Sequence, residues 1–226
     1  KYTDLLIDDK TWLVTVSQSG ETADVIGCIK NIKAKGAKVL GVVNTPNSTI
    51  YQMTDCGIHI RAGKEVSVAS TKAVTNQILA QLLLAYKIGL ENGCSYKDYK
   101  NFLLEVQKLP YFINKVIAQE EKIKGICGTY KDSKTAFVVG RNVLEHIARE
   151  ISYIHAEGYS GSELKHGPLA LIDDQILNIC LLDKNFYPKK TISNIEEIRA
   201  RGGKVILVTN YTKQEIGNKI YDRLIS

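Results

Sequence analysis

A run of hydroxyl and amide side chains directly follows the first apolar segment of the chain. The run, Ser17–Thr22 (SQSGET), lies between an expected strand at 11–16 and an expected helix at 22–35. Backbone N–H groups point outward at such a strand-to-helix turn, and the helix dipole favours an anion there. An ordinary helix N-cap is the alternative explanation. We predict a phosphate site whose ligands are Ser17, Gln18, Ser19 and Thr22.

A second polar cluster occupies the middle of the second half of the chain. Glu150 and Glu157 are seven residues apart in segment 143–157, which we expect to be one helix, so they share a face. His166 stands just before Pro168, a residue favoured at the first position of a helix. A desolvated carboxylate and a histidine suit proton transfer near neutral pH. A surface glutamate and a loop histidine are the structural alternative.

Apolar segments with strand and helix patterns alternate along the chain, which is typical of α/β proteins with parallel sheets. The expected strands are 11–16, 39–43, 57–60, 136–139, 176–182 and 204–208. The expected helices are 22–35, 48–53, 69–89, 96–107, 110–124, 143–157, 166–171 and 191–201. The helix at 69–89 has a wide apolar face, and we expect Ser70 or Thr71 to cap it.

The chain contains an internal repeat. Residues 31–44 (NIKAKGAKVLGVVN) and 197–210 (EIRARGGKVILVTN) share a helix end, a glycine turn, a lysine, an apolar strand and an asparagine. A single offset of this size indicates two copies of one α/β domain rather than a solenoid. We expect domains at 1–125, which includes the connecting helices, and 126–226, with the boundary near Lys122–Ser133.

Composition excludes several classes of protein. The net charge is +6, but the lysines are scattered and form no basic track interleaved with aromatic residues, so we expect no nucleic-acid partner. No apolar run reaches the roughly 18 residues of a membrane helix. Five cysteines without CxxC spacing favour a reduced, cytoplasmic setting. Histidine and cysteine spacing predicts no metal site, and no G-x-S-x-G elbow supports a Ser–His nucleophile.

Four motifs occur in one order that spans nearly the whole chain. They are SQSGET at 17–22, VASTK at 68–72, ISYIHAE at 151–157 and ELKHGPLALID at 163–173. SQSGET marks sugar-isomerase (SIS) domains in general, whereas the last two motifs are far more restrictive. The chain resembles the isomerase half of the glutamine–fructose-6-phosphate aminotransferase family. The fold that this resemblance implies is two tandem SIS domains, each a flavodoxin-like parallel sheet flanked by helices.

The resemblance also implies a reaction. The family converts fructose 6-phosphate to glucosamine 6-phosphate with ammonia that a separate glutaminase domain releases from glutamine. The turn at 17–22 then holds the phosphate, and Val68 and Ser70 line the sugar site. Glu150 moves the proton between C1 and C2, and His166 opens the sugar ring across a homodimer interface. The family requires no metal or organic cofactor.

The chain departs from the family pattern at three places. The family's C-G-T-S turn has no match, the chain ends at Ser226 before a lysine-bearing tail, and the segment between Arg141 and Glu150 is about two helical turns shorter. We therefore expect a piece that is incomplete at both ends. A related SIS enzyme, such as a fructosamine-phosphate deglycase or a deaminase, and a sugar-phosphate-binding regulator stay open as alternatives. A glutaminase domain upstream would discriminate among them.

Overall fold

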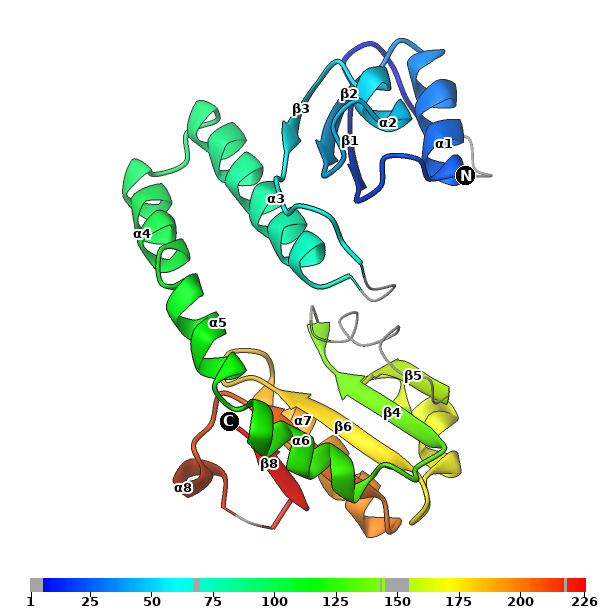
Figure 1. Cartoon of the computed structure of the whole chain (residues 1–226), viewed down its shortest axis with the longest axis vertical. Coiled ribbons are helices and arrows are strands. Elements are labelled where there is room, and N and C mark those ends of the chain that lie inside the picture. Colours follow the sequence, from blue (N-terminus) through cyan, green and yellow to red (C-terminus); the bar gives the residue numbers. More distant parts are fainter. Residues whose placement is uncertain (1–5, 67–69, 143, 145–154, 218) are drawn as a thin grey trace. The chain divides into compact units, whose positions relative to one another are not determined.

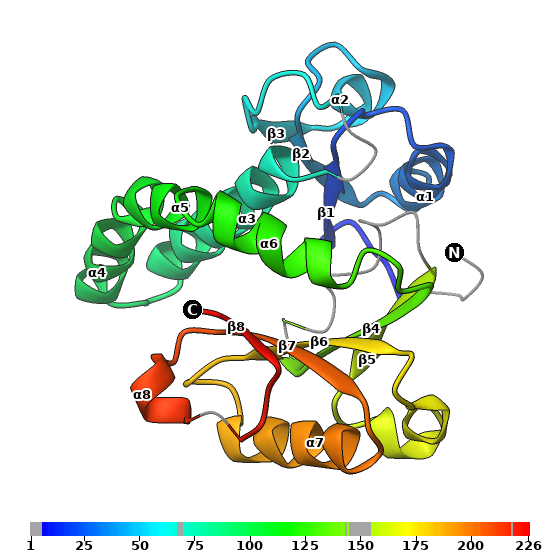
Figure 2. The ribbon, with the colours of Figure 1, turned by 60° about the horizontal axis from the view of Figure 1, so that its bottom comes forward.

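The computed structural model describes residues 6–66, 70–142, 144, 155–217 and 219–226. The chain forms two compact units, Lys1–Leu109 and Pro110–Ser226, which Figures 1 and 2 show in two views. The expected domain boundary near residue 125 lies within the second of these units. The positions at which the two domains begin and end stay a prediction.

The first unit is a three-stranded parallel sheet covered on both faces. Its elements are β1 (Trp12–Ser17), α1 (Ala23–Lys33), β2 (Lys38–Val43), α2 (Thr49–Met53), β3 (Cys56–His59), α3 (Lys72–Glu91) and α4 (Tyr96–Val106). The strands lie in the order β1-β2-β3. Alternate side chains of a strand point to opposite faces: Val39 and Val43 pack with Ile29 of α1, and Val42 packs with Ala73 of α3.

The second unit is a five-stranded parallel sheet in the order β5-β4-β6-β7-β8. Its elements are α5 (Leu109–Ile117), α6 (Glu120–Thr129), β4 (Thr135–Gly140), β5 (His155–Ser160), η2 (Leu164–His166), η3 (Pro168–Leu171), β6 (Leu177–Leu182), α7 (Pro188–Ala200), β7 (Lys204–Thr209), α8 (Lys213–Ile216) and β8 (Arg223–Ile225). Ile126 of α6 packs on one face of the sheet, and Ile195 and Ile198 of α7 pack on the other. Figure 2 shows these two helices on opposite faces of the sheet.

The internal repeat of the sequence is the same substructure formed twice. The order β1–α1–β2–α2–β3 of the first unit recurs as β6–α7–β7–α8–β8 in the second. The glycines of the two repeat turns share a left-handed backbone, with φ of +88° at Gly36 and +84° at Gly202. Glycine adopts this conformation without the steric cost that other residues pay.

An aspartate fastens each copy in the same way. The Val39 N–H donates to Asp55 Oδ2 at 2.7 Å, and the Val205 N–H donates to Asp222 Oδ2 at 2.7 Å. Each carboxylate also pairs with a basic side chain near the end of the long helix of its copy, α1 or α7, at 2.8 Å in the first unit and 2.9 Å in the second. The two basic residues are Lys33 and Arg199. This shared contact supports a duplication beyond the likeness of the two sequence segments.

The expected helix at 143–157 is wrong at its described end. Residues 155–157 belong to β5, which pairs with β4 in the register Thr135↔His155. The free edge of β4 accepts a strand there, and pairing within a sheet outweighs a helical pattern in a short segment. Glu157 is therefore on a strand and shares no helix face with Glu150, which lies outside the described residues together with the rest of 145–154.

Smaller differences concern element ends. The expected helix at 110–124 is two helices, α5 and α6, and that at 166–171 is two 3₁₀ turns, η2 and η3. The helix expected at 191–201 begins earlier, with Pro188 in its first turn. Short elements at the end of the chain, α8 and β8, carry too few residues to show a period in the sequence. The six expected strands are confirmed to within one residue at each end.

Candidate functional site

The turn after β1 presents hydroxyl hydrogens. Ser17 is the last residue of β1 and is 6% exposed. The Gly20 N–H donates to Ser17 Oγ at 2.9 Å, and the Glu21 N–H donates to Ser19 Oγ at 3.2 Å. Because each oxygen already accepts a backbone N–H, each hydroxyl hydrogen remains available for an acceptor. Thr22 is the N-cap residue of α1 but makes no side-chain cap bond, so the ordinary N-cap does not account for its hydroxyl.

Gly20 brings this turn into close contact with the turn after β2. Its φ is +72°, and a Cβ at this position would lie 1.9 Å from Ser48 Oγ. Its carbonyl accepts the Ile50 N–H at 2.9 Å. Only glycine combines this backbone conformation with this approach. The turns after β1 and β2, adjacent strands of a parallel sheet, are thereby held against each other.

Two further bonds join the same pair of turns. The Thr49 N–H at the start of α2 donates to Glu21 Oε1 at 2.8 Å, and Thr45 Oγ1 donates to the carbonyl of Gln18 at 3.1 Å. Thr49, through its hydroxyl and its N–H, lowers the pKa of Glu21 below its usual range. The charge of Glu21 is therefore engaged at a helix N-terminus, where it is favourable.

The loop after β3 is fastened to the same edge of the sheet. Asn44, 6% exposed, accepts the Ala62 N–H at 2.9 Å and donates to the Gly63 carbonyl at 2.8 Å. Farther along this loop, Glu65 Oε2 accepts the Ala73 N–H at 3.0 Å. The expected side-chain cap of α3 by Ser70 or Thr71 is absent among the described contacts, and Glu65 has this role instead.

His166 lies in a different setting, within the second unit. It ends η2, its N–H donates to the Glu163 carbonyl at 2.9 Å, and its side chain is exposed. Gly167 follows with φ of +146°, and Pro168 begins η3. The expected sharp turn at Gly167 and the expected Pro168 at a helix start are confirmed, although that helix is 3₁₀. The imidazole is therefore accessible for a ligand.

Some of the predicted site residues are placed and others are not. Ser17, Gln18, Ser19, Thr22 and Ser70 belong to the first unit, and His166 belongs to the second. Val68 and Glu150 lie outside the described residues. Glu157, on β5, accepts a hydrogen bond from the Tyr159 hydroxyl, and this bond raises the pKa of Tyr159 to about 12. The sequence patterns missed Glu65 because no local motif marks a residue that caps a helix seven positions later.

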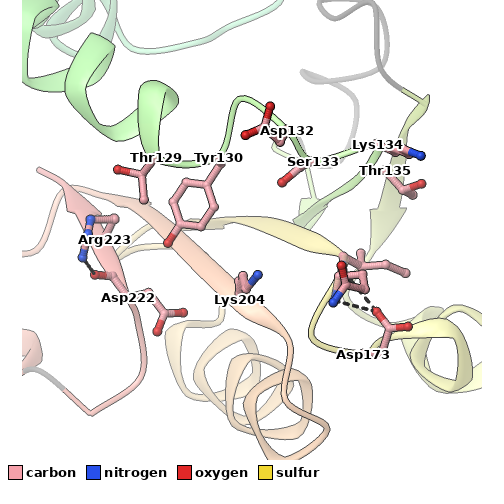
Figure 3. A pocket seen from close by; sticks show the side chains of 12 residues that line it. Thr129, Tyr130, Asp132, Ser133, Lys134, Thr135, Asp173, Lys204, Asp222 and Arg223 are labelled. Atoms are coloured by element: carbon pink, nitrogen blue, oxygen red, sulfur yellow. Dashed lines mark hydrogen bonds between the residues drawn. The ribbon is translucent and has the colours of Figure 1, made fainter.

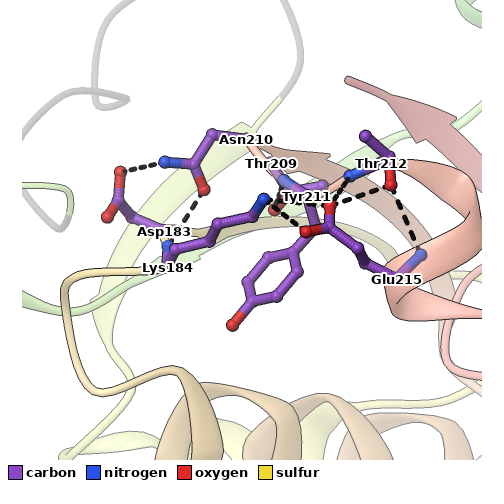
Figure 4. A network of polar contacts seen from close by, with 7 residues as sticks. All are labelled: Asp183, Lys184, Thr209, Asn210, Tyr211, Thr212 and Glu215. Carbon is purple, nitrogen blue, oxygen red and sulfur yellow. Dashed lines mark hydrogen bonds and ion pairs between the residues drawn. The ribbon is translucent and has the colours of Figure 1, made fainter.

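The turn of the second unit that corresponds to residues 17–22 is occupied by a side chain of its own. Asp183 follows β6 as Ser17 ends β1. Its carboxylate accepts hydrogen bonds from the Asn185 N–H at 2.6 Å and from Asn210 Nδ2 at 3.0 Å, and Figure 4 shows the bond to Asn210. Lys184 Nζ pairs with Glu215 at 2.8 Å in the same network. A carboxylate already bound at this turn disfavours a second anion.

A cavity of about 840 Å³ lies at the amino ends of the strands of the second sheet, opposite to the turn at Asp183. Thr135, Lys204 and Arg223, the first residues of β4, β7 and β8, line it, with Tyr130 and Asp222 beside them (Figure 3). Ligands of open parallel sheets bind outside the carboxyl ends of the strands. This cavity is at the amino ends of the strands, and the Asp222 carboxylate already binds the Val205 N–H and Arg199. The cavity is therefore not the predicted site.

The described residues hold no cluster of three or more His, Cys, Asp or Glu side chains that is arranged to bind a metal ion. None of the helices in this described part is long and apolar enough to cross a membrane. All five cysteines are free thiols, and Cys180 is fully buried. Burial raises the pKa of the Cys180 thiol to about 12.

Comparison with known proteins agrees with the two-unit fold. The family model described as the SIS domain matches residues 1–87 and 129–220. The chain belongs to the SIS domain family. The predicted fold, parallel sheets flanked by helices in two SIS copies, is confirmed. The part between the two matches contains α4, α5 and most of α6.

Individual relatives of this SIS chain are similar over almost its full length. Glutamine–fructose-6-phosphate aminotransferase (isomerizing) of Thermus thermophilus is 38% identical over 224 residues, which are 96% of this chain and 37% of that protein. The C-terminal domain of the aminotransferase from Francisella tularensis matches with a TM-score of 0.90 and 32% identity, over 99% of this chain and 66% of that one. The chain thus spans about 37% of the length of the first curated relatives that it matches.

A more distant match shows the fold alone. Glucosamine-6-phosphate deaminase from Thermotoga maritima has a TM-score of 0.71 and 20% identity, over 92% of this chain and 63% of that one. The expected resemblance to the isomerase portion of the aminotransferases is confirmed at the level of sequence by the 38% identity. This identity concerns the sequence, and it assigns neither a reaction nor a role to any single residue of this chain.

Proposed function

We propose that this chain is the isomerase part of a glutamine–fructose-6-phosphate aminotransferase and binds fructose 6-phosphate through the turn at 17–22. The observation that carries the proposal is the polarity of this turn. Ser17 and Ser19 accept backbone N–H groups and so offer hydroxyl hydrogens, and Thr22 makes no cap bond. Hydroxyl donors beside the N-terminus of α1 suit a phosphate, which only accepts when fully ionised.

The remaining roles follow from the resemblance of the motifs. Val68 and Ser70 contact the sugar, Glu150 carries the proton between C1 and C2, and His166 opens the ring. A carboxylate can move this proton when it is desolvated, and a histidine titrates close to neutral pH. The exposure of His166 supports a role in which it serves the site of a neighbouring subunit. The phosphate is remote from the reacting carbons, so its binding energy positions the sugar.

The same proposal includes partners and setting. Ammonia for the amination comes from a glutaminase domain of the full-length protein, and the assembly is a cytoplasmic homodimer. Five free thiols support a reducing compartment. No metal or organic cofactor takes part, because proton transfer between adjacent carbons needs only the carboxylate and the histidine.

Ligand binding and solvent-proton exchange test this proposal. Fructose 6-phosphate should raise the melting temperature of the chain, because a ligand of the native state stabilises it, whereas fructose at the same concentration should not. In the full-length protein, Glu150→Gln should abolish exchange of the sugar C1 proton with solvent and keep the affinity.

Two outcomes contradict the proposal. The absence of any thermal shift at millimolar fructose 6-phosphate or glucosamine 6-phosphate would contradict the phosphate site. Binding without proton exchange in the unaltered full-length protein would instead indicate a regulator that senses sugar phosphates.

A further inference from the structure

Glu65 and Ser70 form a pair whose polarity is opposite to that of the turn at 17–22. Ser70 Oγ lies 3.1 Å from Glu65 Oε2. An ionised carboxylate only accepts hydrogen bonds, so the Ser70 hydroxyl is the donor and its lone pairs remain for another group. At Ser17 and Ser19 the oxygen accepts and the hydrogen remains. One site therefore offers donors and the other offers an acceptor.

Glu65 also occupies the N-terminus of α3. Its Oε2 accepts the Ala73 N–H at 3.0 Å. The N–H groups of Ala73 and Thr71 and the Ser70 hydroxyl hold the pKa of Glu65 below its usual range. A free helix N-terminus attracts anions, whereas one that carries a carboxylate repels a second anion. The phosphate of a ligand is thereby directed to the turn at 17–22 and away from α3.

The backbone around this pair is held to the carboxyl edge of the first sheet. Asn44 follows β2 and bonds Ala62 and Gly63, which precede Glu65 by three and two residues. Its neighbour Thr45 bonds the carbonyl of Gln18 in the phosphate turn. Hydrogen bonds and short stretches of backbone within the first unit thus connect the donor site to the acceptor site.

We propose that Glu65 is a positioning residue that orients the Ser70 hydroxyl as a hydrogen-bond acceptor for a hydroxyl group of the bound sugar. The ligand class is a polyol phosphate, with its phosphate at the turn after β1 and a free hydroxyl at Ser70. This inference rests on the proposed function and adds the polarity and orientation of the ligand. Glu65 acts through Ser70 and does not itself contact the phosphate.

The test compares two probes, fructose 6-phosphate and inorganic phosphate, by calorimetry on the full chain. Ser70→Ala removes the hydroxyl that accepts the hydrogen bond of the sugar. Glu65→Gln replaces the carboxylate by an amide, which can donate to Ser70 and turn the Ser70 hydroxyl from an acceptor into a donor toward the sugar. Each variant should raise the Kd for fructose 6-phosphate about tenfold and leave the Kd for inorganic phosphate unchanged. The double variant should lose no more than Ser70→Ala, because the two residues act as one unit.

Two further variants serve as controls. Ser70→Thr, which keeps the hydroxyl, should retain the affinity for fructose 6-phosphate. Glu91→Gln changes a glutamate at the other end of the same helix, whose side chain is 73% exposed. This variant should leave the affinity for both probes unchanged.

An equal loss of affinity for both probes in Glu65→Gln, or an unchanged affinity for fructose 6-phosphate in Ser70→Ala, would overturn the inference. Ser70→Ala keeps the Glu65–Ala73 bond, so it tests the acceptor role of Ser70 even when Glu65→Gln does not fold. A chain that binds no fructose 6-phosphate before any substitution contradicts the proposed function. Full affinity in Ser70→Ala contradicts the contact of Ser70 with the sugar, whereas a loss in Ser70→Ala without a loss in Glu65→Gln contradicts only the role of Glu65.

Discussion

At the scale of single residues, the geometry of the phosphate turn depends on Gly20. Its left-handed backbone and its contact with Ser48 allow the turns after β1 and β2 to meet. Gly63 has the same φ, +72°, but no atom within 4 Å of an added Cβ. These two glycines therefore separate the cost of the backbone conformation from the cost of the contact.

We predict that Gly20→Ala destabilises the chain by about 3 kcal/mol, since it adds a steric clash to a left-handed backbone. Gly63→Ala introduces only the strain of a left-handed backbone, so its free energy of unfolding should fall by about 1 kcal/mol. Urea unfolding of both variants measures the difference. Equal losses would show that Ser48 moves aside freely and that the two turns are not held together at this point.

The sequence predicted the types of the candidate ligand residues but not the groups that they contact. Ser17, Ser19 and Thr22 were assigned from a local motif at a strand-to-helix turn, and the structure has them in such a turn. Glu21 and its partner Thr49 are 28 residues apart, and no local pattern joins them. Which atom of the Ser17 and Ser19 hydroxyls stays free is decided by the backbone geometry of the turn, which brings the N–H groups of Gly20 and Glu21 to the two oxygens. This polarity could be read only from the structure.

At the scale of elements, the six strands with apolar runs were predicted well, whereas β5, α8 and β8 were missed. A buried strand of a parallel sheet is a continuous apolar run, as in β7, Lys204–Thr209, and such runs are conspicuous. The strand β5 has no such run, because its sequence, HAEGYS, is half polar. Its place follows from the free edge of β4, which is a tertiary property. The start of α8 depends likewise on side-chain contacts rather than on periodicity.

A pH-dependent prediction belongs to α8. Lys184, and then Thr212, lower the pKa of Glu215 to about 2 from its usual 4.5. Because the folded pKa lies below the unfolded one, this carboxylate stabilises the fold above pH 4.5, and the stabilisation is lost as the pH falls toward 2. The gap in urea midpoint between the unaltered chain and Glu215→Gln should therefore be present at neutral pH and shrink across that range.

The matched control is Glu91→Gln, which removes an exposed pair with Lys87 on α3. Its gap in urea midpoint should be small at every pH, since exposed pairs contribute little. A gap for Glu215→Gln that does not change between neutral and acidic pH would contradict the role of the ionised carboxylate in the network of Figure 4.

At the scale of the whole molecule, one substructure occurs twice but only one copy has a turn suited to an anion. The aspartate clamps at Asp55 and Asp222 are alike, so the two copies share their framework. Their carboxyl edges differ: the first copy has hydroxyl donors at 17–22, and the second has the carboxylate of Asp183. The repeat could be read from the sequence, whereas this difference in polarity required the contacts.

The most direct test of the central claim is a titration of the chain with fructose 6-phosphate, followed by backbone amide NMR. The largest shifts should occur at the amides of residues 17–22, with the counterpart turn at 183–187 unchanged and with the same pattern for inorganic phosphate. Shifts centred on the counterpart turn or on the amino ends of β4 and β7, with residues 17–22 unchanged, would contradict it.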